Sequence, residues 1–197
     1  IYGLGRFGYL WAQLLSSCCS VKAYNRNPER ETPPGVTRVE RGALCQCDVI
    51  FLCVAISALE EVLQSLEHVL RPGTIVADTC SVKVYPAYLM QKYIPAGIEI
   101  MATHPMFGPD SARYGVQGLP LVLCPIRLSH NNKAYWEALF NRLGLNVLEL
   151  TPEEHDKEAA FSQGITHFIG RVLDDLNLNP TIIGTRGYKD LLEIIEQ

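Results

Sequence analysis

The sequence has 197 residues, of which 48% are hydrophobic and 19% are charged. This composition is typical of a soluble globular protein with enough residues for one full domain and part of a second. The formal net charge of −4 gives no general attraction for nucleic acid or an anionic membrane, and no apolar run approaches the roughly 20 residues of a membrane-spanning helix.

The hydrophobic pattern predicts strands and helices that alternate along the first 150 residues. Residues 48–56 form a continuous apolar run, which is typical of a strand buried on both faces. The predicted strands are 21–24, 48–56, 74–78, 98–103, 119–124 and 146–150, and the predicted helices are 9–17, 58–70, 84–93 and 131–143. Strands joined by crossover helices imply an α/β fold with a doubly wound, mostly parallel sheet.

The composition changes near residue 150, where we place a domain boundary. Thr151 is a predicted N-cap, and the acidic residues after Pro152 suit the first turn of a helix that runs to about residue 176. A loop at 177–187 and a last helix from near Tyr188 follow. The predicted domains are therefore 1–150 and 151–197, the second being the start of an all-helical domain for substrate binding and dimerisation.

Both ends of the sequence suggest a piece of a longer protein. A strand of about five residues is expected before Gly3, yet only Ile1 and Tyr2 precede it. Residues 191–197 have an amphipathic helical pattern without a stop signal. We expect further chain at both ends.

The seven cysteines show no spacing typical of a zinc site or a disulfide framework. Several lie in apolar runs, so we interpret them as reduced thiols of a cytoplasmic protein. The acidic run 153–156 is not a metal site either, because adjacent helical positions point in different directions. We expect no bound metal.

Gly3, Gly5 and Gly8 form a G-x-G-x-x-G fingerprint followed by a predicted helix and, about 20 residues on, by the end of a second strand. This context is typical of a Rossmann-type dinucleotide site, where the glycines allow a tight turn, close approach of the pyrophosphate and close packing of helix on strand. A glycine-rich turn without a ligand is the alternative. The residues expected to bind the cofactor are Gly3, Gly5, Arg6, Phe7, Gly8, Asn25, Arg26 and Ser57.

The end of the second strand favours NADP over NAD. An acidic residue there would bind the adenosine ribose, but the sequence has Tyr24-Asn25-Arg26-Asn27, with Arg30 close by. No carboxylate is available there, and a guanidinium suits the additional phosphate of NADP. The alternative is that Arg26 is a solvated surface residue.

His104 and Ser81 are the candidate catalytic residues. Each lies in a stretch that follows a predicted strand, where open parallel sheets bind ligands. An imidazole titrates near physiological pH and can take a proton from a substrate hydroxyl as hydride leaves the same carbon, while Ser81 could orient it or a bound water. The alternatives are a structural histidine and a helix-capping serine.

Three stretches, the fingerprint, 78–83 (DTCSVK) and 104–111 (HPMFGPDS), resemble the prephenate and arogenate dehydrogenases. So do 154–156 (EHD) and 162–167 (SQGITH), and 184–188 (GTRGY) is most similar to plant arogenate dehydrogenases. The resemblance implies oxidative decarboxylation of arogenate or prephenate on the way to tyrosine. It also implies a homodimer formed through helices beyond Gln197, and a plastid location if the source is a plant.

The resemblance also implies roles for single residues. His104 would accept the proton of the ring hydroxyl, and Ser81 would sit between His104 and the nicotinamide. His167 would help bind the substrate, although it could equally be a core histidine. A cation from the helical domain would hold a substrate carboxylate, and we favour Arg186 without excluding Lys189, because a guanidinium is the better carboxylate partner.

Two other functions stay open at this point. One is another Rossmann dehydrogenase that acts on a hydroxy acid, which leaves the 104–109 stretch unexplained. The other is a regulatory module that binds NADP without turnover.

Overall fold

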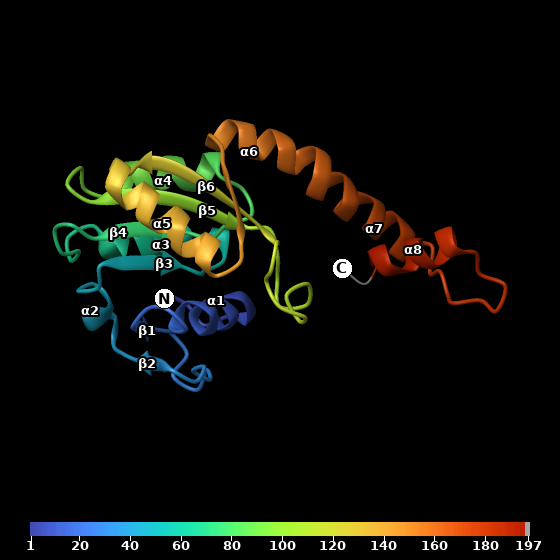
Figure 1. The fold of residues 1–197 in the computed structure, drawn as a ribbon, viewed down its shortest axis with the longest axis horizontal. Coiled ribbons are helices and arrows are strands. Elements are labelled where there is room, and N and C mark those ends of the chain that lie inside the picture. Colours follow the sequence, from blue (N-terminus) through green and yellow to red (C-terminus); the bar gives the residue numbers. More distant parts are fainter. Residues whose placement is uncertain (196–197) are drawn as a thin grey trace. The chain divides into compact units, whose positions relative to one another are not determined.

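The computed structural model describes residues 1–195 and, among these, the side chains of residues 1–193. It contains two compact units, Ile1–Glu153 and Glu154–Gln197. The first unit is the α/β part of the chain and the second is helical (Figure 1). No helix among residues 1–195 is long and apolar enough to cross a membrane.

The first unit is built on parallel strands, as the sequence predicts. A pair, β1–β2, lies beside a five-stranded sheet in the order β3-β4-β5-β6-β7. Among the strand pairings of residues 1–195, all are parallel except β5–β6, which is antiparallel. Tyr2 forms parallel bridges to Tyr24, just after β1, and to Leu52 of β3, so the segment before the glycines joins the two sheets. The strands are β1 Val21–Ala23, β2 Val36–Arg38, β3 Val49–Leu52, β4 Ile75–Asp78, β5 Glu99–Pro105, β6 Pro120–Arg127 and β7 Asn146–Glu149.

Helices cover both faces of this sheet (Figure 1). Alternate residues of β3 show why: Phe51 packs in one cluster with α1 and α5, whereas Ile50 and Leu52 pack in a second cluster with α3 and α4. This alternation is what a doubly wound sheet requires. The helices are α1 Arg6–Ser16, α2 Arg41–Leu44, α3 Ile56–Leu66, α4 Val84–Tyr93 and α5 His130–Arg142.

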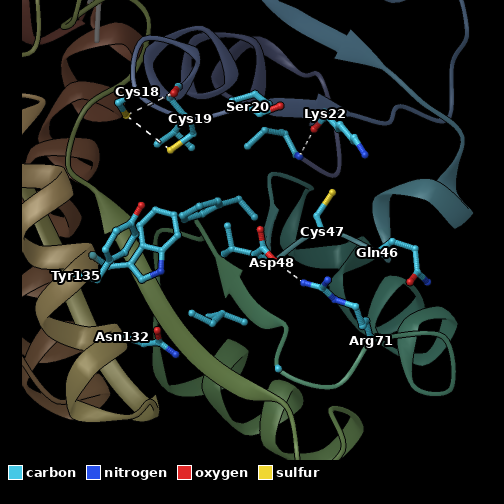
Figure 2. A pocket seen from close by; sticks show the side chains of 18 residues that line it. Cys18, Cys19, Ser20, Lys22, Gln46, Cys47, Asp48, Arg71, Asn132 and Tyr135 are labelled. Atoms are coloured by element: carbon cyan, nitrogen blue, oxygen red, sulfur yellow. Dashed lines mark hydrogen bonds and ion pairs between the residues drawn. The ribbon is translucent and has the colours of Figure 1, made fainter.

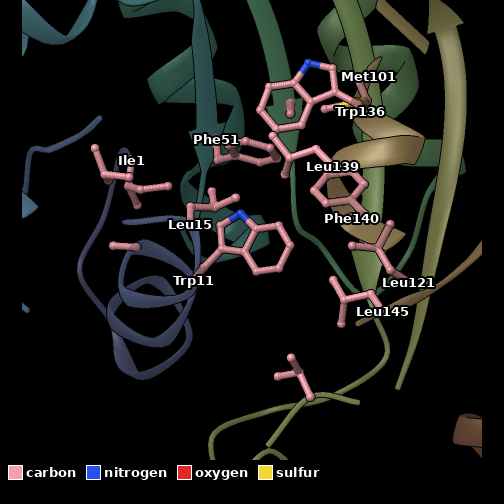
Figure 3. Close-up of a cluster of buried hydrophobic side chains, with 14 of the residues drawn as sticks. Ile1, Trp11, Leu15, Phe51, Met101, Leu121, Trp136, Leu139, Phe140 and Leu145 are labelled. Atoms are coloured by element: carbon pink, nitrogen blue, oxygen red, sulfur yellow. The ribbon is translucent and has the colours of Figure 1, made fainter. Parts of the chain in front are cut away.

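An aromatic cluster packs α1 and α5 against the sheet (Figure 3). Trp11 of α1 meets Phe51 edge-on at 5.6 Å between ring centroids, and Phe51 meets Trp136 of α5 at 5.4 Å. Phe140 lies 5.8 Å from Trp11 and 5.4 Å from Trp136. Edge-to-face and tilted ring pairs at these distances are favourable, so the cluster holds α1, the helix that follows the glycine turn, firmly against the sheet.

Two elements of the first unit are missing from the sequence-based prediction. These are β2 and the single-turn helix α2, both too short to give a clear hydrophobic period. The helix α1 also begins three residues before the predicted start, directly after Gly5. The helix α3 begins two residues before its predicted start, at the last residue of the predicted strand 48–56. Residues 84–93 form α4 as predicted.

The second unit continues the helix that starts at the end of the first. Its elements are α6 Pro152–Ala159, the π-helical turn Ala160–Gly164, α7 Ile165–Asp175 and α8 Arg186–Ile195. Within this unit α7 packs against α8. One side of α7 carries large apolar side chains that stay exposed, among them Phe168 at 68% and Leu176 at 62%.

Candidate active site

The three glycines of the fingerprint, two before α1 and Gly8 within it, differ in what the structure requires of them. Gly3 has a φ of +102°, and a Cβ there would lie 2.5 Å from the carbonyl oxygen of Cys53. A Cβ on Gly8 would lie 2.1 Å from the carbonyl oxygen of Gly3, so the helix packs directly on the turn. At Gly5 a Cβ would meet no atom within 4 Å, and φ is an ordinary −65°. The fold does not need Gly5, but a phosphate that approaches the backbone would need this open space.

The start of α1 completes a cradle that fits a dinucleotide. The N-cap residue is Gly5, which has no side chain, so it makes no capping hydrogen bond to the first N–H groups of the helix, where the fingerprint places phosphates. Phe7, in the first turn, is half-buried and stacks 5.8 Å from Trp11. Its ring therefore belongs to the core, whereas Arg6 is exposed beside the turn.

Side chains from the segment after β1 hold the glycine turn from its other side. The side-chain oxygen of Asn25 accepts a hydrogen bond of 2.8 Å from the backbone N–H of Leu4, and Arg30 Nε donates one of 2.7 Å to the carbonyl oxygen of Leu4. Arg38 donates hydrogen bonds to three carbonyl oxygens of the same segment. Arg26 is exposed and makes no side-chain hydrogen bond or ion pair with the residues that the structure describes, so its guanidinium is available to a ligand.

A pocket of about 440 Å³ opens beside this turn. It is lined by Arg6, Tyr9, Glu29, Arg30, Glu31 and Pro109. The prediction that no carboxylate is available there is wrong, because the loop after β1 brings two glutamates to the pocket. The pocket therefore offers cations for phosphate and carboxylates for hydroxyl groups, a mixture that the residues nearest the strand end do not reveal.

A larger pocket of about 630 Å³ lies at the opposite edge of the sheet (Figure 2). Its lining includes Val21, Val49 and Ile75, which are at or near the first residues of three parallel strands. The Arg71–Asp48 ion pair crosses its wall. Ligands of open α/β sheets bind at the carboxyl ends of the strands, so this pocket is not the candidate site.

A buried ion pair connects the carboxyl ends of β4 and β5. The side chains of Asp78 and Lys83 are fully buried, with Lys83 Nζ 2.5 Å from Asp78 Oδ2. Lys83 also donates a hydrogen bond of 2.6 Å to the carbonyl oxygen of Thr103, and the Thr103 hydroxyl donates one of 2.6 Å to the carbonyl oxygen of Asp78. The Thr103 carbonyl belongs to the peptide group that carries the His104 N–H. The ion pair thus fixes the peptide plane from which His104 projects.

His104 lies within β5 rather than after it. The predicted strand ended at residue 103, but the antiparallel partner β6 extends the pairing to Pro105, and His104 is opposite Val122. This is a correction to the prediction. The imidazole is 5% exposed, so it is held in place by packing.

Ser81 and Ser57 lie at the same edge of the sheet. Ser81 is exposed in the bend between β4 and α4, two residues before Lys83, and β4 is the parallel neighbour of β5. Ser57 is the second residue of α3, which follows β3, and Tyr2 bridges β3 to the glycine turn. The carboxyl ends of β3, β4 and β5 thus bring both serines to the edge where His104 and the glycines lie.

The three predicted substrate-binding residues belong to the helical unit. His167 is exposed on α7, and Arg186 and Lys189 are exposed in the first turn of α8. Residues three apart on a helix share a face, so the two cations project from the same side. Within the described residues, no three His, Cys, Asp or Glu side chains gather as a metal site would require.

Two pairs in this region have no assigned role in the sequence analysis. One is Asp78–Lys83, and the other is an ion pair between Arg6 and Asp110. A charged residue that ends an apolar strand is a usable signal for the first, because buried charges need partners. The second joins residues 104 positions apart, and nothing in the local pattern indicates it.

Comparison with known proteins identifies the family of the nucleotide-binding part. Residues 35–148, more than half of the chain, match the nucleotide-binding domain of prephenate dehydrogenase. Over 155 residues the chain is 37% identical to arogenate dehydrogenase 2, chloroplastic, of Arabidopsis thaliana, with 76% of this chain and 43% of that protein covered. It is 26% identical over 210 residues to the NADP(+) prephenate dehydrogenase of Saccharomyces cerevisiae, with 100% of this chain and 46% of that protein covered.

The fold matches as well. A crystal structure of prephenate dehydrogenase from Aquifex aeolicus, in complex with hydroxyphenyl propionate and NAD+, superposes with a TM-score of 0.78 at 19% identity, covering 99% of this chain and 76% of that one. The chain spans less than half the length of the two curated relatives named above. By the match of its nucleotide-binding domain, the chain belongs to the prephenate dehydrogenase family.

Proposed function

We propose that this chain is part of an enzyme that oxidises and decarboxylates arogenate or prephenate with NADP as the hydride acceptor. One observation carries the proposal. A buried ion pair fixes the backbone of His104 at the same sheet edge as the glycine turn, and in that turn Gly5 leaves the space that a phosphate would need. The names of the relatives, arogenate dehydrogenase and NADP(+) prephenate dehydrogenase, support the reaction class.

The chemistry assigned to this chain is a proton transfer at one oxygen. His104, as a neutral imidazole, accepts the proton of the ring hydroxyl while hydride leaves the same carbon. The nicotinamide, when bound, accepts that hydride. As the ring carboxylate departs as carbon dioxide, its electron pair enters the ring, and His104 returns the proton to the oxygen to give a phenol. Ser81 would orient the imidazole from the neighbouring strand end.

We propose that the segment after β1 favours binding of NADP over NAD. Arg26 is exposed and available, and Arg30, whose Nε is bound to the carbonyl oxygen of Leu4, lines the pocket. A guanidinium suits a phosphate better than a ribose hydroxyl. Glu29 and Glu31 line the same pocket and would oppose a second phosphate unless they face the hydroxyl groups. The ratio of kcat/KM values for the two cofactors tests this point, and a clear preference for NAD would reject it.

Arogenate is proposed ahead of prephenate as the substrate. The two differ in an amino versus a keto group on the side chain. The support comes from the GTRGY stretch at 184–188 and from the Arabidopsis relative. His167 and one of the two cations of α8, Arg186 in preference to Lys189, would bind the substrate, with the cation on a carboxylate.

We also propose a homodimer formed through the helical part of the protein. The support is an apolar side that runs along the π-helical turn and α7 to its C-cap, where Phe161, Ile165, Phe168, Val172 and Leu176 are all at least 45% exposed. Patches of this kind mark interaction sites. Light scattering of the full-length protein would show twice the monomer mass, and a monomer at micromolar concentration would reject the proposal. The chloroplastic relative supports a plastid location in a plant, and the cytoplasm is proposed otherwise.

A single assay tests the proposed reaction. The full-length protein is mixed with NADP or NAD and with arogenate or prephenate, and reduced cofactor is followed by absorbance. Turnover with NADP and at least one substrate is expected, with release of one carbon dioxide per hydride. No turnover with either substrate would reject the proposal, and cofactor binding without turnover would favour a regulatory module.

A further inference from the structure

An ion pair joins the glycine turn to the segment that follows His104. Arg6 Nη2 lies 2.8 Å from Asp110 Oδ1 and 2.7 Å from Asp110 Oδ2. Arg6 is the first residue of α1, and Asp110 lies six residues after His104. The pair therefore connects the candidate cofactor site to the candidate catalytic strand within one compact unit.

The carboxylate of Asp110 binds a guanidinium that would also suit a phosphate. It is bound by the first residue of a helix whose start has no side-chain cap, and that helix follows the fingerprint that places dinucleotide phosphates at its N-terminus. Arginine binds carboxylate and phosphate with the same geometry. Pro109, next to Asp110, lines the pocket beside the glycine turn together with Arg6. Asp110 and a bound dinucleotide would thus require the same guanidinium.

Stability alone does not account for the pair. The side chains of Arg6 and Asp110 are 70% and 80% exposed, and exposed ion pairs contribute little to stability. The segment after His104 also has its own local bonds, since Gly108 N–H binds the Ser111 hydroxyl and Ala112 N–H binds the Gly108 carbonyl. Because the ion pair is weak, Arg6 can exchange Asp110 for another anionic partner at little cost in stability.

We propose that Asp110 is an internal competitor of the dinucleotide for Arg6. This inference rests on the proposed function and adds a binding order to it. Without cofactor, Asp110 holds Arg6 and ties the 106–115 segment to the glycine turn. A phosphate oxygen of the cofactor takes Arg6 and releases Asp110. Residues 108–111, which lie between the buried Phe107 and Ala112, then become free to accept substrate only after the cofactor has bound.

The test is a double-mutant cycle on cofactor affinity, measured by isothermal titration calorimetry of the full-length protein at low salt. In D110N the affinity for NADP is expected to rise about two- to fivefold, because the competitor is lost. In R6Q it is expected to fall about tenfold, because a charge-assisted bond to phosphate is lost. In the R6Q background, D110N is expected to change nothing. Glu60→Gln is the matched control, because it removes a carboxylate of α3 from its ion pair with Lys92 of α4. We expect it to leave the affinity for NADP unchanged.

Hydrogen exchange gives a second readout that does not depend on turnover. In the wild type, NADP is expected to speed amide exchange in residues 106–115, and in D110N the same amides exchange fast without cofactor. The inference is overturned if D110N fails to tighten NADP, or if it tightens NADP equally in the R6Q background. A protein that binds and turns over normally while D110N has no effect loses only this inference. A wild type that binds no NADP loses the proposed function as well.

Discussion

Lys83 donates a hydrogen bond of 2.6 Å to the backbone carbonyl of Thr103, although the two residues lie on different elements and are 20 positions apart. The lysine reaches this carbonyl from a fully buried position that it shares with Asp78. Because a buried charge without its partner is costly, loss of either charge would destabilise the place where the two strands end.

Replacing Lys83 with Met should therefore destabilise the first unit by about 3–5 kcal/mol, since Asp78 would be left as an unpaired buried carboxylate. The urea unfolding midpoint measures this loss. In the double variant with Asp78→Asn, a large part of the stability should return, because no buried charge remains. Equal stability of K83M and the wild type would show that the pair contributes nothing to the strand ends.

His104→Asn should lower kcat by about 100-fold or more while the Kd for NADP stays near that of the wild type. The asparagine keeps a polar side chain of similar size at a buried position but cannot accept the proton. His68→Asn, at an exposed position in the turn after α3, is the matched control and should keep full activity. Unchanged kcat in H104N would remove this residue from the mechanism.

The glycine turn offers a pair of substitutions with opposite outcomes. Gly5→Ala adds a Cβ to open space, so the melting temperature should stay close to that of the wild type while the affinity for NADP falls at least tenfold. Gly8→Ala adds a Cβ 2.1 Å from the Gly3 carbonyl oxygen and should destabilise the fold itself. Calorimetric melting and cofactor titration separate the two effects. Undiminished NADP affinity in G5A would contradict the cradle.

Arg26→Ala should weaken NADP selectively. The guanidinium is exposed and has no side-chain partner among the described residues, so its loss should not disturb the loop that Arg38 holds. We expect kcat/KM for NADP to fall about tenfold and kcat/KM for NAD to stay within twofold. An equal loss for both cofactors would show that Arg26 does not read the additional phosphate.

Two thiols near the site should remain protonated at working pH. Burial raises the pKa of Cys53 to about 11 and that of Cys80 to about 12, so both thiols are neutral in the folded protein at neutral pH. Because these pKa values are raised above the unfolded value, the stability linked to them is present at pH 8 and is lost as pH rises through about 9–12. The urea midpoint should fall between pH 8 and pH 10.5. The fall should be smaller in a Cys53→Ala, Cys80→Ala variant, and an identical fall in both proteins would contradict the assignment.

Much of the fold follows from hydrophobic runs and turn residues, as the apolar strand around Phe51 and the helix over 84–93 illustrate. Short elements such as Val36–Arg38 do not follow, because three residues, two half-buried and one exposed, are too few to show a hydrophobic period. The place where β5 ends depends on its pairing with β6, a non-local fact, and this is why His104 lies inside the strand.

The site was only partly readable for the same reason. The glycines and His104 lie in local sequence patterns that indicate their chemical roles. In contrast, the contacts of Lys83 with Thr103 and of Arg6 with Asp110 exist only after the chain has folded. Glu29 and Glu31 were missed because the loop after β1 bends them into the pocket.

The chain has two tryptophans, and both are buried in the cluster between α1, α5 and the sheet. Tryptophan fluorescence therefore reports on the first unit alone, because the helical unit contains no tryptophan. Comparing this signal with helical ellipticity during melting would tell whether the two units unfold as one cooperative body or in sequence.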